Sequence, residues 1–180
     1  YRVGHGDTII LESCEYCNSF LSFFPTVAVI LNIEADHLDF FKDLDDVEHS
    51  FRAFADRVPE SGIIVANADA NTMHTLEGEE RPVLTFGLEQ GDVRAANLAW
   101  NRGLPSFDVV YRGDVFTHVA LRVPGEHNVK NALAAAAAAI ALAGGRLRGP
   151  GRLPGGGPPL RAQGHLPRGG GVRRLRPPPR

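Results

Sequence analysis

The first half of the chain alternates between short apolar runs and longer polar stretches. The apolar runs are nearly continuous and rich in β-branched residues, and they span residues 7–11, 27–31, 62–66 and 82–86. Such runs are typical of strands that are buried on both faces of a parallel sheet. The pattern therefore predicts four parallel strands.

Apolar residues with helical spacing lie between the second and third predicted strands. Val47, Phe51, Phe54 and Val58 recur every three or four residues, and most charged positions between them fall on the other side. This periodicity predicts an amphipathic helix. A helix between two such strands implies a right-handed parallel crossover.

From about residue 92 to residue 123 the pattern changes to alternating segments. Residues 107–111 and 116–121 flank the turn 112–114, which predicts an antiparallel hairpin beside the parallel sheet. A Pro-Gly turn then opens an alanine-rich segment to about Leu142, and alanine favours helix. The predicted fold is α/β, with a mostly parallel sheet flanked by helices and an antiparallel hairpin subsheet.

The last 37 residues have a different composition. Residues 144–180 hold 11 Gly, 8 Pro and 9 Arg and no acidic residue, which leaves 10 basic against 21 acidic side chains in residues 1–143. We expect residues 1–143 to form the folded domain and residues 144–180 to be a disordered tail. The acidic body argues against a nucleic-acid partner. No apolar run is long enough to span a membrane.

The two cysteines, Cys14 and Cys17, have the spacing of a redox pair or of half a zinc site. No second pair of ligands follows them in the sequence, so neither interpretation is favoured. Free thiols agree with a reducing, cytoplasmic location.

Three polar clusters follow predicted strands, at residues 12–15, 32–37 and 67–69. The carboxyl ends of parallel strands meet at one edge of a sheet, where ligands gather. Carboxylates there are suitable ligands for Mg²⁺, although helix caps or solvated loop ends have the same composition. Imidazole is a poorer Mg²⁺ ligand, so chemistry alone leaves His37 as a cap or supporting residue.

A further polar group opens the alanine-rich helix. His127, Asn128 and Asn131 follow the Pro-Gly turn, where free backbone N–H groups and amide side chains can meet a base or a phosphate. Asn is also a common helix cap, so the spacing alone leaves both interpretations open.

Residues 12–20, 32–37 and 124–132, taken together and in this order, resemble the central domain of the Mur ligases. The resemblance covers residues 1 to about 142, and the most similar type within the family joins L-alanine to UDP-N-acetylmuramate. It implies a P-loop-NTPase-like, ATP-binding domain, truncated at its N-terminus, of a cytoplasmic enzyme of peptidoglycan synthesis. The implied reaction uses ATP to form an acyl phosphate, which the amine then attacks.

The resemblance also implies roles for individual residues. Glu15 and His37 would be catalytic residues that bind Mg²⁺, and Ser19 and Asp36 would lie beside the muramate substrate. The adenine nucleotide would lie near three residues, His127, Asn128 and Asn131.

The family's Gly-rich phosphate loop ends in Gly-Lys-Thr or Gly-Lys-Ser, and the sequence contains no such run. We therefore expect these 180 residues to lack ligase activity by themselves. Another Mur-type or folylpolyglutamate-type ligase remains an alternative, as does a nucleic-acid-binding module that uses the basic tail.

The tail also permits a genetic interpretation. Residues 172–179 can be encoded so that a one-base shift yields Tyr-Asp-Asp-Tyr-Ala-His-His-Pro, and residues 158–161 can conceal Arg-Arg-Phe-Glu. Both strings resemble motifs of the same ligase type, in the same order. We therefore hypothesise a frameshift between about residues 142 and 151. Codons that do not permit the alternative frame, read from the DNA, would exclude it.

Overall fold

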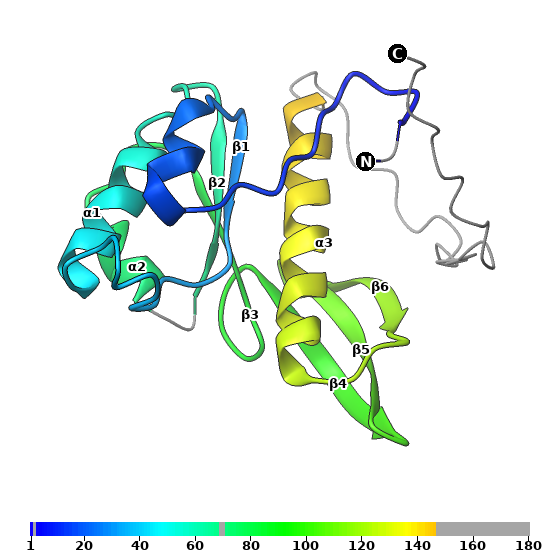
Figure 1. The fold of residues 1–180 in the computed structure, drawn as a ribbon. Coiled ribbons are helices and arrows are strands. Elements are labelled where there is room, and N and C mark those ends of the chain that lie inside the picture. The colour runs from blue at the N-terminus through cyan, green and yellow to red at the C-terminus, as the bar shows by residue number, and fades with distance from the viewer. Residues whose placement is uncertain (2, 69–70, 147–180) are drawn as a thin grey trace, which may run out of the picture.

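The computed structural model describes residue 1, residues 3–68 and residues 71–146. Its strands form a six-stranded sheet in chain order (Figure 1). They are β1 (Val27–Ile30), β2 (Ile63–Asn67), β3 (Val83–Gly87), β4 (Val93–Asn101), β5 (Leu104–Tyr111) and β6 (Asp114–Ala120). The pairs from β1 to β4 are parallel, and β4–β5 and β5–β6 are antiparallel. The mixed sheet confirms the predicted fold class.

Two of the described helices were predicted from the sequence. They are the 3₁₀ helix η1 (Tyr16–Ser22), α1 (Leu44–Ala55), α2 (Thr72–Thr75) and α3 (Glu126–Arg146). Helices α1 and α3 confirm the predictions, and α3 continues past the expected end near Leu142. None of the helices in the described ranges has both the length and the apolar character needed to cross a membrane.

The helices cover both faces of the parallel strands. Figure 1 shows η1, α1 and α2 on one side of β1 and β2, and α3 on the other. In β2, Ile64 and Ala66 pack into the core with α1, whereas Val65 packs into the core with α3. Successive side chains of a strand point to opposite faces, so β2 is buried on both sides, as its apolar run predicts.

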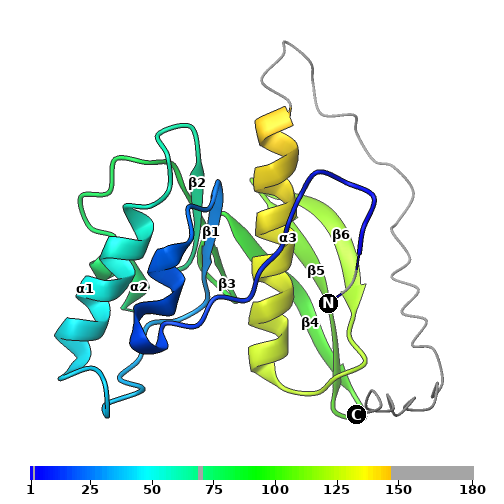
Figure 2. The ribbon, with the colours of Figure 1, turned by 45° about the horizontal axis from the view of Figure 1, so that its top comes forward.

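Residues 7–11 do not form the first strand that the sequence predicts. Ile9 and Ile10 retain 82% and 89% of their exposed area. In Figures 1 and 2 this segment runs past α3, outside the sheet, and β1 is the edge strand. That prediction was wrong because an apolar run does not reveal whether a neighbouring strand is available for backbone hydrogen bonds.

The antiparallel end of the sheet holds a polar cluster around Asp108. The amide of Asn97 donates to one carboxylate oxygen at 2.8 Å, and Nδ1 of His118 lies 2.7 Å from the other. These hydrogen bonds, with that from Asn97 the larger cause, hold the pKa of Asp108 below its ordinary value of 3.8. The stabilisation is therefore present above the unfolded-state pKa and is lost as pH falls through the lower folded-state pKa.

Replacing Asn97 by glycine is expected to raise the pKa of Asp108, because the main hydrogen bond to the carboxylate is lost. Glycine is chosen because φ at this position is 52°, which alanine adopts with strain. The carboxyl carbon of Asp108, followed by NMR as pH is lowered, measures the change. An unchanged titration midpoint would show that Asn97 does not hold the carboxylate.

Candidate active site

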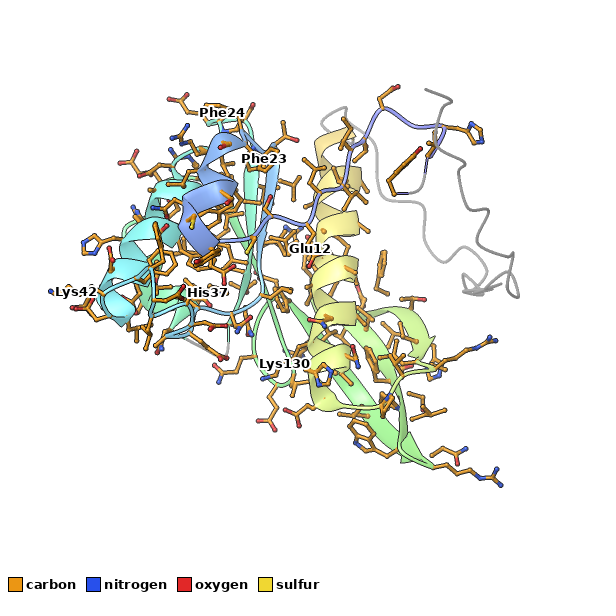
Figure 3. All side chains as sticks on the ribbon, viewed as in Figure 1. Glu12, Phe23, Phe24, His37, Lys42 and Lys130 are labelled. Carbon is orange, nitrogen blue, oxygen red and sulfur yellow. The ribbon has the colours of Figure 1, made fainter. Side chains whose placement is uncertain are left out.

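The candidate residues gather where the parallel strands end. Phe23 and Phe24 precede β1 at one end of the sheet, and His37 follows it at the other (Figure 3). Helix α3 begins at this same carboxyl-end side and runs back along the sheet (Figures 1 and 2). The loops after β1 and the start of α3 therefore share one end of the domain, as expected for a ligand site in such a sheet.

Glu15 and His37 meet at this end of the domain. Oε1 of Glu15 lies 3.3 Å from Nε2 of His37, and the two side chains retain 29% and 34% of their exposed area. They come from different segments, one before η1 and one after β1. The structure thus brings together the two residues predicted to bind Mg²⁺, and leaves them open to a ligand.

Local hydrogen bonds hold the backbone at His37. Its φ of 53° lies in the left-handed region, which residues other than glycine seldom adopt. The side chain of Asp36 accepts a hydrogen bond from the His37 N–H at 2.7 Å. The His37 carbonyl accepts from the N–H groups of Phe40 and Phe41, and Phe41 is buried. This turn therefore ties His37 to the core.

Glu15 is held by the start of η1. Its carbonyl accepts from the Asn18 N–H at 2.8 Å, and the Asn18 side chain accepts from the Ser50 hydroxyl of α1. Phe20 is buried with its ring stacked on Phe54 of α1 at 4.7 Å. Packing on α1 therefore positions the segment that carries Glu15.

Tyr16 lies within residues 12–20, and its type and spacing predict no role for it. Its ring centroid lies 4.9 Å from that of His37, and its hydroxyl donates to Asp39 at 2.9 Å. The hydrogen bond to Asp39 is the main cause that raises the pKa of Tyr16 above its ordinary value. The side chain of Tyr16 thus limits the positions open to the His37 ring, and no local spacing signals this contact.

Cys14 also joins the group. One ligand atom from each of Cys14, Glu15 and His37 lies within 4.8 Å of the others. The sequence favoured no metal role for Cys14, because only Cys17 followed it at ligand spacing. The tertiary structure supplies different neighbours, a carboxylate and an imidazole.

The two residues predicted to lie beside the muramate are exposed and locally bonded. Ser19 donates its hydroxyl to the Tyr16 carbonyl at 2.7 Å, which leaves oxygen lone pairs free to accept. Asp36 accepts from His37, as described above. Both lie on the segments that carry Glu15 and His37.

The third polar cluster, at residues 67–69, contributes a structural contact. Asn67 is buried and donates its amide to the Leu31 carbonyl at 2.9 Å, which joins the ends of β1 and β2. Asp69 lies outside the described residues. Among the described residues, the structure therefore brings together Glu15 of the first cluster and His37 of the second.

The predicted nucleotide-binding residues form the start of α3. The Asn128 amide donates to the Pro124 carbonyl at 2.7 Å and lies 3.1 Å from Nε2 of His127. Gly125 has a φ of 101°, and a Cβ there would lie 2.5 Å from the His127 ring. Asn128 thus donates to the preceding turn from within the helix, which is not the accepting role of a helix cap. His127 and Asn131 are exposed.

A cavity of about 500 Å³ lies at the other end of the sheet, away from the candidate residues. Thr26, Gly62 and Pro82, at the amino ends of the parallel strands, line it together with the last turns of α3. None of the predicted site residues contributes to its walls. The candidate residues therefore lie at the carboxyl ends of the parallel strands rather than in this cavity.

Residues 5–139 match the Mur ligase middle domain. The chain is 46% identical over 144 residues to a UDP-N-acetylmuramate–L-alanine ligase of Caldanaerobacter subterraneus subsp. tengcongensis, covering 78% of this chain and 31% of the relative. It is 44% identical over 142 residues to the ligase of that name from Clostridium novyi, with the same coverage. The chain thus spans about a third of the length of these relatives.

Solved structures show the same fold. The UDP-N-acetylmuramate:L-alanyl-gamma-D-glutamyl-meso-diaminopimelate ligase from Neisseria meningitides superposes with a TM-score of 0.59 at 36% identity, over 69% of this chain and 38% of that one. The UDP-N-acetylmuramate-alanine ligase from Thermotoga maritima gives a TM-score of 0.58 at 27% identity, over 70% and 28%. The chain therefore belongs to the Mur ligase family, of which it contains the middle domain.

Proposed function

We propose that this chain is the middle domain of an ATP-dependent ligase that joins L-alanine to UDP-N-acetylmuramate in peptidoglycan synthesis. The observation that carries the proposal is the 3.3 Å contact between Glu15 and His37 at the carboxyl ends of the strands. The 46% identity to a ligase of that name supports the choice of substrates. The excess of acidic over basic side chains in residues 1–143 argues against a nucleic-acid partner.

In the proposed reaction the γ-phosphoryl group of ATP is transferred to the muramate carboxylate, which forms an acyl phosphate and ADP. The amine of L-alanine then attacks the acyl carbon through a tetrahedral intermediate and releases inorganic phosphate. Bound Mg²⁺ would neutralise phosphate charge during the transfer. The protein's own part is to hold the reacting groups in line and to supply fixed charges around them.

The donor set fits Mg²⁺ in part. Glu15 offers the carboxylate oxygen that this ion prefers. The imidazole of His37 is a weaker ligand for it, but its contact with Oε1 restricts the Glu15 side chain. We therefore assign Glu15 to direct binding, and His37 to binding or to the positioning of Glu15.

The substrates are assigned to the remaining site residues. Ser19 and Asp36 lie on the segments of Glu15 and His37 and would contact the muramate. His127, Asn128 and Asn131 would contact the adenine nucleotide at the start of α3. A helix N-terminus favours anionic groups because its first N–H groups have no partner within the helix.

A chimera tests this proposal. Residues 5–139 replace the matching segment of the Caldanaerobacter ligase, whose other parts supply the phosphate loop implied by the family resemblance. We expect phosphate release that requires ATP, UDP-N-acetylmuramate and L-alanine together. We expect none from the 180-residue chain, whose sequence contains no Gly-Lys-Thr or Gly-Lys-Ser run.

Two outcomes would contradict these expectations. A chimera that folds, as judged by its circular dichroism and melting curve, but releases no phosphate would show that this domain cannot serve the reaction. Robust turnover by the 180-residue chain would show that the phosphate loop is not required.

A further inference from the structure

Three different ligand types converge beside η1. Cys14 offers a thiol, Glu15 a carboxylate and His37 an imidazole, and their ligand atoms all lie within 4.8 Å of one another. Cys14 is exposed and the other two side chains are half-buried. A solvated ion can therefore reach all three without opening the core.

The chemistry of this group differs from that of a magnesium site. Mg²⁺ prefers six oxygen ligands at octahedral positions, and a thiolate is a poor partner for it. A sulfur, a nitrogen and a carboxylate oxygen together suit Zn²⁺, and Co²⁺ binds such sites with the same geometry but lower affinity. With Cys14 as a third donor, Glu15 and His37 can therefore also hold an ion of the zinc class.

The distances are compatible with a tetrahedral ion. Bond lengths of about 2.0–2.3 Å place neighbouring ligand atoms about 3.3–3.8 Å apart. Glu15 and His37 already lie 3.3 Å apart. The Cys14 sulfur lies within 4.8 Å of both, so it needs to approach by at most about 1 Å, which the rotation of an exposed side chain between rotamers can provide. Three protein ligands leave the fourth position for water.

The backbone holds the ligands close together before any ion binds. The Cys14 carbonyl accepts from the N–H of buried Phe20 at 3.1 Å, and His37 is held by Asp36 and by the turn that follows. Less conformational entropy is therefore lost on binding than in a mobile loop.

We propose that Cys14, Glu15 and His37 form a binding site for a divalent transition-metal ion of the zinc class. The site uses two side chains of the proposed magnesium site, but it does not depend on the ligase activity. Because Glu15 and His37 are shared, a bound zinc ion excludes Mg²⁺ from them. Zinc would then compete with magnesium for Glu15 and His37.

Co²⁺ titration of the 180-residue chain, with Mg²⁺ absent, tests the site. Binding through a thiolate produces a sulfur-to-cobalt charge-transfer band in the near ultraviolet, which Zn²⁺ should abolish by displacement. We expect Cys14→Ser to remove the band. His37→Gly should raise the dissociation constant at least about tenfold, because one of three protein ligands is lost, and glycine adopts the φ of 53° at this position without strain.

Cys17 provides the matched control. It is also an exposed free thiol, three residues further along, but it is not part of the convergent group. Cys17→Ser should therefore keep the band. The inference is wrong if wild type shows no thiolate band, if Cys14→Ser keeps it, or if Cys17→Ser loses it.

The cobalt titration and the chimera assay test the two proposals separately. An active chimera together with a chain that gives no thiolate band would overturn the zinc-class site and leave the proposed ligase intact. A chain that binds Co²⁺ through Cys14 together with an inactive, folded chimera would overturn the ligase and leave the metal site.

Discussion

Replacing Glu15 by glutamine in the chimera is expected to lower kcat/KM for phosphate release by about 10²–10³-fold, the effect of removing one preorganised charge-stabilising group. Glutamine keeps the size of the side chain and one oxygen, but it loses the negative charge that would bind Mg²⁺. The loss should be partly recovered at higher Mg²⁺ concentration if weakened metal binding is the cause. Initial rates over a Mg²⁺ series measure both effects.

Glu60→Gln is the control for this substitution. Glu60 is exposed and precedes β2, at the amino end of the strand and thus at the far end of the sheet from Glu15. The Glu60→Gln variant loses the same charge without touching the candidate site. Its kcat/KM should therefore stay within about twofold of that of the unsubstituted chimera. A Glu15→Gln enzyme as active as the control would remove Glu15 from the mechanism.

Replacing Phe20 by alanine is expected to lower the free energy of unfolding of the 180-residue chain by about 3–5 kcal/mol, the usual loss for a buried phenylalanine. The ring is 2% exposed, is stacked on Phe54 and meets Phe51 edge-on at 5.2 Å. Domains are stable by only about 5–15 kcal/mol in total, so the change is large. Urea unfolding followed by circular dichroism measures it.

Phe24→Ala provides the comparison, because Phe24 is 72% exposed and lies only four positions away. The Arg57 guanidinium lies 5.0 Å from the centroid of the Phe24 ring. Such a cation–π contact contributes about 0.5–1 kcal/mol at an exposed site. Phe20→Leu should fall between the two alanine variants. Equal midpoints for Phe20→Ala and Phe24→Ala would show that η1 is not anchored through the Phe20 ring.

The regular elements of the fold could be predicted because their signals are local. The apolar runs at β1, β2 and β3 and the spacing of Val47 and Phe54 report burial on known faces, and the structure confirms each of them. The alanine-rich composition of α3 is also a local signal, because alanine favours helix. Each of these patterns is contained in a single strand or in a few turns of one helix.

Residues 7–11 and η1 show where local signals fail. The apolar run at 7–11 predicts a strand, yet a strand also needs a partner, and β1 pairs with β2 alone among the described strands. Helix η1 has no helical periodicity, and Cys17 and Asn18 interrupt it with positive φ values. It is held instead by Phe20 on α1 and by the bond between Ser50 and Asn18.

The sequence by itself named candidate residues: the motif resemblance predicts Glu15 and His37 as metal ligands. The apolar run at residues 27–31 correctly places His37 after a strand, whereas the run at residues 7–11, which was to place Glu15, forms no strand. Only the tertiary structure decided the distance between these two residues, the contact of Tyr16 with the His37 ring and the addition of Cys14 to the group. The physical reason is that residue type and spacing specify donors, whereas a metal or phosphate site depends on distances of a few ångströms between segments. Those distances are set by the packing of η1 on α1 and by the backbone turn at His37.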